Sequence, residues 1–256
     1  MPACFFYIYT TMEDINTLLK QYAERYETED FLPTDPSWFM HQVNGDTNKE
    51  TTAFIASCLS YGNRKQFMPK IQSILDFADN NVHEWVLNGR FSENIPDDNT
   101  TCFYRLYTYH TMHSLLTALQ QMLIEHGSIG NYVKDNATDG FTAVKAITGY
   151  FASKKIETII PKNTASACKR VCMFLRWMVR DNSAVDLGLW KNFIDKRTLI
   201  IPMDTHVLQE ANKLGLINSK TASMTAARKL TARLTEIFPD DPLKGDFALF
   251  GYGVNH

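Results

Sequence analysis

The chain has 256 residues, of which 45% are hydrophobic and 21% charged, and its formal net charge is −2 at pH 7. This composition is typical of an ordinary soluble globular protein, and the length suffices for one large domain or two small lobes. No stretch of about 18 apolar residues occurs, which excludes a membrane-spanning helix.

The N-terminal stretch 1–10, MPACFFYIYT, is apolar but short and contains neither Lys nor Arg. It lacks the charged start and the cleavage site of a signal peptide. Because a helical pattern begins at Met12, we interpret residues 1–11 as a flexible or non-native extension. Residues 12–256 are then expected to form a single domain.

The five cysteines are scattered along the chain and form no C-x-x-C pair. An odd number without such a pair indicates a reducing compartment and argues against a disulfide framework, a zinc site or an iron–sulfur cluster. We therefore expect a cytoplasmic protein that needs no metal and no cofactor.

Apolar residues recur at helical spacing through most of the chain, and no segment alternates convincingly with period two. In the first segment, Ile15, Leu18 and Leu19 fall on one stripe. Residues 51–62 are almost all apolar, which predicts a helix buried on all sides. Helices are expected at 12–27, 51–62, 64–82, 111–127, 142–155, 167–180, 205–216 and 225–238.

The longest breaks in the helical pattern lie at 31–38, 92–101 and 181–203. The pattern as a whole predicts an all-α protein, a two-lobed helical bundle with a cleft between the lobes.

Charge is unevenly distributed. Residues 154–197 contain ten Lys or Arg and four Asp or Glu, a local charge of +6, while the rest of the chain carries −8. A basic face on a near-neutral protein suits a phosphate-bearing partner. A solvated helical face explains the same charges equally well.

Within 167–180, apolar residues recur at i, i+3, i+4 and i+7 from Val171 and form the expected buried stripe. Lys169, Arg176 and Arg180 fall on another face, which suits phosphate contacts along a strand. Lys169 lies in the first helical turn, where the helix dipole and nearby arginines disfavour a cation. A lysine there gives up its proton more readily, as an amine nucleophile requires. Taken alone, a surface lysine is the more frequent explanation.

Asp204 follows the apolar run 199–201 and Pro202, and it directly precedes the helix expected at 205–216. An Asp in this place caps the backbone N–H groups of the helix, which is the simplest explanation. A carboxylate held there also stays ionised and oriented, so it can stabilise a developing cation or activate a nucleophile. The two roles remain open at this point.

The segment PMDTHVLQEANKLGL, 202–216, resembles the helix-hairpin-helix DNA glycosylase superfamily. Its members carry an Asp-Thr-His-Val or similar stretch just before a helix. In that superfamily the aspartate is catalytic, and bifunctional members have a lysine upstream. Lys169 precedes Asp204 by 35 residues, a gap that resembles the archaeal 8-oxoguanine glycosylase branch, which has an atypical hairpin.

Two more motifs extend the resemblance. ASCLSYGNRKQF, 56–67, is similar to the helix-turn-helix that inserts a residue into the duplex when the base leaves. In GDFALFGYG, 245–253, Asp246 and Phe250 lie one helical turn apart and resemble the acid and aromatic ring that recognise the extruded base. The whole chain also resembles a bacterial family of uncharacterised proteins, marked by LSYGNRKQ, CKRVCMFLRWMVRD, VDLGLW and DFALFGYG.

The chain departs from the superfamily in two places. The Gly-x-Gly of the hairpin is missing, and PKNTASACKR, 161–170, stands in its place. Gly62 occupies the position at which relatives often carry a Gln in the base pocket. These departures leave the identity of the damaged base open.

The resemblance implies a DNA repair glycosylase with AP lyase activity, which flips a damaged purine out of double-stranded DNA. The first candidate for this purine is 8-oxoguanine. Asn63 would fill the gap in the duplex, and Arg64 would face the orphan base or a phosphate. A helix-capping turn explains 61–64 equally well, and core packing explains Phe250. The residues assigned are Lys169 and Asp204 for catalysis; Asp246, Phe250, Tyr61 and Gly62 for the base; and Asn63, Arg64, Lys65, Arg170, Arg176, Arg180 and His206 for DNA.

Two alternatives stay open. One is a nucleic-acid binding module that kept the fold without the chemistry. The other is a monofunctional glycosylase in which Asp204 activates water and Lys169 only contacts DNA. In each case we expect a monomer in the bacterial cytosol that binds DNA and no membrane.

Overall fold

The computed structural model describes residues 12–156 and 158–255, and it confirms the all-α prediction. The expected extension 1–11 lies outside the described residues. The elements are α1 Met12–Tyr26, η1 Glu29–Thr34, α2 Trp38–His41, α3 Asp46–Leu59, α4 Arg64–Phe77, α5 Val82–Leu87, α6 Phe91–Asn94, β1 Cys102–Tyr104, β2 Tyr107–Thr108, α7 Tyr109–His126, α8 Ile129–Asn136, α9 Gly140–Ser153, α10 Lys169–Val179, η2 Lys196–Thr198, α11 Thr205–Lys213, α12 Met224–Ile237 and α13 Lys244–Asn255.

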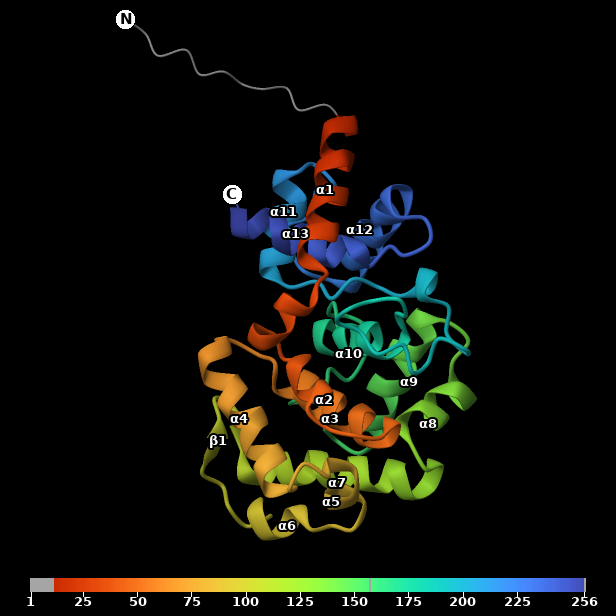
Figure 1. Cartoon of the computed structure of the whole chain (residues 1–256). Coiled ribbons are helices and arrows are strands. Elements are labelled where there is room, and N and C mark those ends of the chain that lie inside the picture. The colour runs from red at the N-terminus through yellow and green to blue at the C-terminus, as the bar shows by residue number, and fades with distance from the viewer. Residues whose placement is uncertain (1–11, 157, 256) are drawn as a thin grey trace, which may run out of the picture.

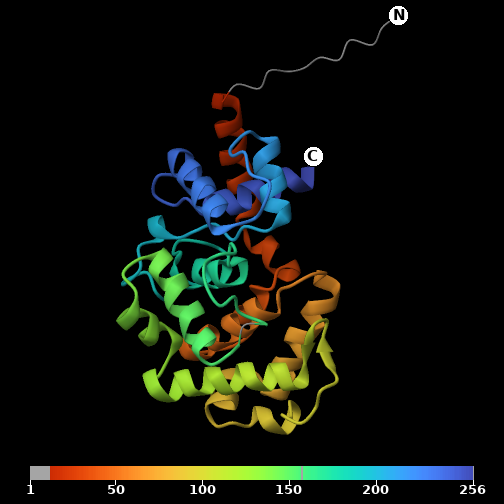
Figure 2. The ribbon, with the colours of Figure 1, turned by 180° about the vertical axis from the view of Figure 1, so that it is seen from behind.

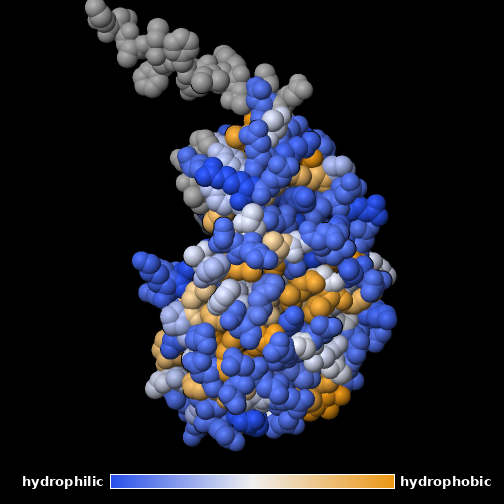
Figure 3. Space-filling model, in the orientation of Figure 1, coloured by the Kyte–Doolittle hydropathy of each residue, from blue (hydrophilic) through white to orange (hydrophobic). Residues whose placement is uncertain are grey.

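The helices form two groups (Figures 1 and 2). The N-terminal helix α1 packs along the C-terminal helix α13, and α11 packs on α13 as well, so the two ends of the chain build one group together with α12. Helices α2 to α9 form the other group. Helix α10 packs on α3 and α9 and lies where the two groups meet (Figure 1). In the space-filling view, the outline is indented between the two groups (Figure 3).

The helical periodicity correctly located the main helices. Helix α3 is buried on nearly all sides, as its apolar sequence predicted, and it packs against α2, α10 and α5. In α10, the stripe that begins at Val171 is buried. The helix starts carry local caps: the side chains of Thr108, Ser128, Asp139 and Ser223 each accept a backbone N–H of the following helix.

A short antiparallel hairpin, β1–β2, was not predicted by the sequence. Cys102 pairs with Thr108 and Tyr104 with Tyr107. Its strands have three and two residues, which is too short for a period-two pattern to emerge. The expected breaks at 31–38 and 181–203 also contain short helical turns, η1, α2 and η2.

A buried carboxylate joins three parts of the larger group. Glu50 of α3 is 5% exposed and accepts the backbone N–H groups of Ile129 and Gly130, at 2.8 and 3.0 Å, at the start of α8. It also accepts the indole N–H of Trp190 at 2.8 Å. A Cβ at position 130 would meet both Trp190 and Glu50, so a glycine is required there. Glu50 therefore fixes α8 and the loop before η2 against α3.

No helix among residues 12–156 and 158–255 is long and apolar enough to cross a membrane. In the view of Figure 3, hydrophilic residues cover most of the surface and hydrophobic residues appear in separate patches.

We predict that Glu50→Gln lowers the free energy of unfolding by about 1–3 kcal/mol, because one of the three N–H donors loses its acceptor in a buried site. Urea denaturation followed by circular dichroism measures the change. Glu24→Gln, on the exposed side of α1, is the matched control and should leave the midpoint in place. Equal midpoints for both variants would contradict this role of Glu50.

Candidate active site

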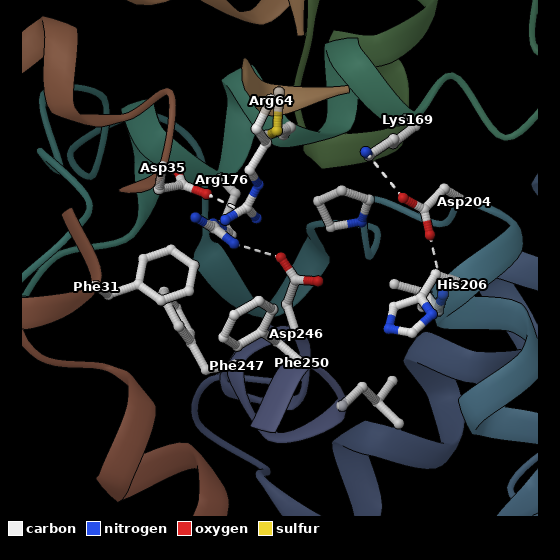
Figure 4. Close-up of a pocket in the computed structure, with 14 residues that line it drawn as sticks. Phe31, Asp35, Arg64, Lys169, Arg176, Asp204, His206, Asp246, Phe247 and Phe250 are labelled. Atoms are coloured by element: carbon white, nitrogen blue, oxygen red, sulfur yellow. Dashed lines mark hydrogen bonds and ion pairs between the residues drawn. The ribbon is translucent and has the colours of Figure 1, made fainter. Parts of the chain in front are cut away.

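Lys169 and Asp204 form an ion pair. Lys169 is the first residue of α10, after Cys168, which adopts the left-handed conformation with φ +48°. Its Nζ lies 2.9 Å from Asp204 Oδ2, and the two side chains are 37% and 36% exposed (Figure 4). The other oxygen, Oδ1, accepts the backbone N–H of Val207 at 2.9 Å. Asp204 is therefore a helix cap and a partner of the lysine at once, with one oxygen for each role.

The environment of Asp204 favours its ionised form. Burial raises the pKa of the carboxyl, but the charge of Lys169 and the Val207 N–H outweigh it, so the pKa lies below its usual value. The carboxylate thus keeps a negative charge beside the lysine at neutral pH.

The ion pair lies at the edge of a pocket between the two groups of helices. The pocket has a cavity volume of about 180 Å³ and opens in part to solvent. Its lining comes from η1 and the residue after it, α4, α10, the chain before α11, the first turn of α11, and α13 (Figure 4). The lining residues are Phe31, Asp35, Arg64, Lys169, Met173, Arg176, Pro202, Asp204, His206, Val207, Asp246, Phe247, Leu249 and Phe250.

Asp246 and Phe250 share this pocket, one turn apart on α13 as the sequence predicted. The Asp246 side chain is 15% exposed and pairs with Arg176 through Oδ2. Burial raises the pKa of Asp246, and the Arg176 charge offsets this only in part. Phe250 is half-buried and makes edge contacts with the rings of Tyr26 and Phe31, at 5.6 and 5.1 Å between centroids. Phe250 thus belongs to the pocket wall and not to the closed core.

The assignment of Arg176 and Arg180 to DNA contact was wrong. Their side chains are 5% and 0% exposed. Arg176 pairs with Asp186 and Asp246, and Arg180 pairs with Asp186, Asp241 and Glu27. A buried guanidinium requires such partners, so these two arginines hold the fold and the pocket together.

The charge excess of 154–197 does not form one basic face. Besides the two buried arginines, Lys154, Lys196 and Arg197 each pair with a carboxylate. The local charge in the sequence therefore overstated the exposed positive charge of this segment.

A second, more open groove adjoins the pocket and shares Lys169, Asp204 and His206 with it. Tyr61 and Gly62 line this groove and not the pocket, which corrects their assignment to the base. The ion pair consequently lies on the boundary between a partly enclosed pocket and a more open groove. The His206 side chain is 57% exposed and lies 4.0 Å from Glu210, facing both spaces.

The loop 61–64 is held by its surroundings. Asn63 caps α4 by accepting the N–H of Lys65 at 2.9 Å. Arg64 points to the pocket, where it donates to the carbonyl of Thr34 at 3.0 Å and lies over the ring of Phe250 (Figure 4). Arg64 is thus engaged at the pocket in this structure, whereas Asn63 and Lys65 are exposed.

The hairpin β1–β2 supports the same loop, a role that the sequence analysis missed. Tyr104 donates its hydroxyl proton to the carbonyl of Tyr61, and Arg105 lies over the Tyr61 ring, 4.7 Å from its centroid. Gly62 has φ +87°, and a Cβ there would overlap the Arg105 guanidinium. Arg170 approaches the Tyr61 ring from α10, at 5.8 Å. The positive φ therefore favours glycine at position 62, and the absence of a side chain there accommodates Arg105.

The sequence analysis also missed Phe31, Asp35 and Met173. Met173 follows Lys169 by four residues, so helical spacing alone brings it to the same pocket. Phe31 and Asp35 come from the segment between α1 and α2, and no local pattern in the sequence marks them as pocket residues.

Comparison with known protein families assigns the chain to one family. A family model described as "Protein of unknown function (DUF2400)" matches residues 35–255. The chain belongs to this family. No curated protein and no solved structure matches it. The resemblance to DNA glycosylases therefore stays a prediction, to be judged on the site itself.

We predict that Arg180→Leu lowers the free energy of unfolding by about 3–5 kcal/mol, because Asp241 remains buried without its cation and Asp186 keeps only Arg176. Urea denaturation measures the loss, with Lys65→Leu on the exposed surface as control. If Arg180→Leu kept full stability and bound DNA more weakly, Arg180 would be a DNA contact and not a structural ion-pair partner.

A second prediction concerns pH. Because the pKa of Asp204 is depressed in the folded protein, its stabilising effect is fully present above its unfolded pKa and is lost as pH falls through the folded value. The stability advantage of the wild type over Asp204→Asn should thus be constant above about pH 5 and shrink below about pH 4. Thermal melts at several pH values measure it. An advantage that grows on acidification would contradict the assignment.

Proposed function

We propose that the protein is a DNA glycosylase with AP lyase activity that removes a damaged purine, with 8-oxoguanine as the first candidate. The observation that carries the proposal is the 2.9 Å pair of Lys169 and Asp204 on the boundary between the pocket that Asp246 and Phe250 line and a more open groove. Membership of the family is compatible with this activity and does not specify it.

The position of the pair fits a flipped nucleotide. Chemistry on a base requires that the base leave the duplex, at a cost of a few kcal/mol. With the base in the pocket and the phosphate backbone in the groove, the deoxyribose lies between them, beside Lys169 and Asp204. A single arrangement thus accounts for the two spaces and for the residues that separate them.

The charges beside the groove favour a polyanion. Arg170 lines the groove, and Arg105 of the hairpin lies over the ring of Tyr61, which also lines it. Within the described part of the chain, neither arginine pairs with a carboxylate. Cations of this kind bind phosphates and release counterions, so affinity for DNA should fall steeply with salt. Asn63 is exposed next to Gly62 and is the residue we propose to enter the duplex.

The pocket suits a purine with several N–H groups. The carboxyl of Asp246 is held by Arg176 through one oxygen, which leaves the other to accept ring N–H groups. Phe250 offers an aromatic surface, and a base stacked on an aromatic ring gains about 1–3 kcal/mol. Both residues come from one turn of α13, so base recognition does not depend on a mobile loop.

In the chemical step, the nitrogen of Lys169 bonds to C1′ while the bond from C1′ to the base breaks, and the base leaves with the electron pair. One proton must first leave the ammonium group, and Asp204 Oδ2 lies within hydrogen-bond distance to accept it. Asp204 passes this proton on to solvent, and the carboxylate that is restored stabilises the positive charge that develops on the sugar. The sugar ring then opens to a Schiff base, and loss of a C2′ proton with cleavage of the C3′–O bond nicks the strand.

We predict that borohydride traps the wild-type protein on a duplex that contains 8-oxoguanine, and that Lys169→Ala abolishes the trapped band, because the Schiff base requires the amine. Duplexes with uracil, an abasic site or no lesion are run beside it on a denaturing gel. DNA affinity of Lys169→Ala should stay within about tenfold of the wild type, since one phosphate-type contact contributes little.

The outcomes separate the alternatives. A band with the abasic duplex alone would support the lyase activity and show that the protein excises a base other than 8-oxoguanine or uracil. Release of the base without any band would favour a monofunctional glycosylase, in which Asp204 activates water. Salt-dependent DNA binding with neither band nor release would leave a non-catalytic binding module. A band that persists in Lys169→Ala would remove Lys169 from the proposed role.

A further inference from the structure

The turn η1 and the residue after it form part of the pocket wall. We define residues 26–35 as the N-terminal arm. It contributes Phe31 and Asp35 to the pocket that contains Asp204 and Asp246. Figure 4 shows Phe31 on the far side of Asp246 from the Lys169–Asp204 pair. The family match begins at residue 35, so Phe31 lies outside the part of the chain that defines the family.

The aromatic rings of the arm fix the ring of Phe250. Phe31 makes edge contacts with Phe247 at 5.2 Å and with Phe250 at 5.1 Å between centroids. Tyr26 contacts Phe250 from the same arm, at 5.6 Å. Contacts of this type favour one ring orientation and stabilise it beyond the effect of burial. Phe31 is itself only half-buried, because it borders the cavity.

The arm is also tied to the loop that we propose to enter DNA. Asp35 is 6% exposed and accepts the N–H and hydroxyl of Ser37, at 3.0 and 2.8 Å. Its other oxygen lies 3.5 Å from Arg64, which also donates to the carbonyl of Thr34. The position of the arm is therefore determined from the α4 side as well as from α13.

We propose that Phe31 is a specificity-determining residue of the base pocket. Its ring closes the end of the pocket opposite the catalytic pair and holds Phe250 in the orientation that stacks on the extruded base. Phe31 thus selects which base fits, whereas Lys169 and Asp204 act on the sugar. This inference rests on the proposed function and adds to it a residue outside the matched segment.

The test measures how strongly the protein prefers the damaged duplex, in a variant that cannot form the Schiff base. In a Lys169→Ala background, fluorescence anisotropy gives the dissociation constants for a duplex with 8-oxoguanine and for the same duplex undamaged. Phe31→Leu keeps an apolar side chain against Leu32 and Phe247 but removes the ring. We expect it to reduce the preference for the damaged duplex about tenfold, as expected for loss of an aromatic stacking arrangement. Phe31→Tyr, which keeps the ring, should restore the preference.

Phe39→Leu is the matched control, because Phe39 is buried in α2 and does not line the pocket. It should lower the melting temperature and leave the preference unchanged. If Phe31→Leu melts too early for the assay, Phe31→Met is measured instead.

An unchanged preference in Phe31→Leu or Phe31→Met overturns the proposal, and so does a parent protein that does not distinguish the two duplexes. A preference that depends on Phe31, in a protein that borohydride does not trap, supports the inference and refutes only the lyase chemistry.

Discussion

The site depends on the burial of two guanidinium groups. Arg176 and Arg180 lie in the interior on α10, where a charge without a partner costs several kcal/mol. Their carboxylates come from four separate places: Glu27 at the end of α1, Asp186 in the long loop, Asp241 before α13 and Asp246 within it. The pairing therefore draws both ends of the chain onto α10.

The same helix has a second use. The last turns of α10 carry the buried arginines, and its first residue, Lys169, reaches the solvent edge of the pocket. Since Arg176 pairs directly with Asp246, the network that stabilises the fold also positions the carboxylate proposed to bind the base. One helix of 11 residues thus contributes both to the stability of the fold and to the proposed active site.

The features that the sequence predicted are mainly local. Helical periodicity located α1, α3, α7 and α10, and the cap signal located Asp204, because both depend on residues within one or two turns. The one-turn spacing of Asp246 and Phe250 was correct for the same reason. The aligned arginines of α10 were misjudged, since their partners lie between 6 and 153 residues away in the sequence. Phe31 escaped notice because its role arises only when α1 folds back onto α13.

The contact between Gly62 and Arg105 has an evolutionary consequence. A side chain at position 62 would collide with the guanidinium, so a replacement there requires Arg105 to shift or to be replaced at the same time. The two positions should therefore change together among related chains, although 43 residues separate them. A chain with a long side chain at 62 would be expected to have a hairpin tip of different composition, and the protein would then present a different surface beside the groove.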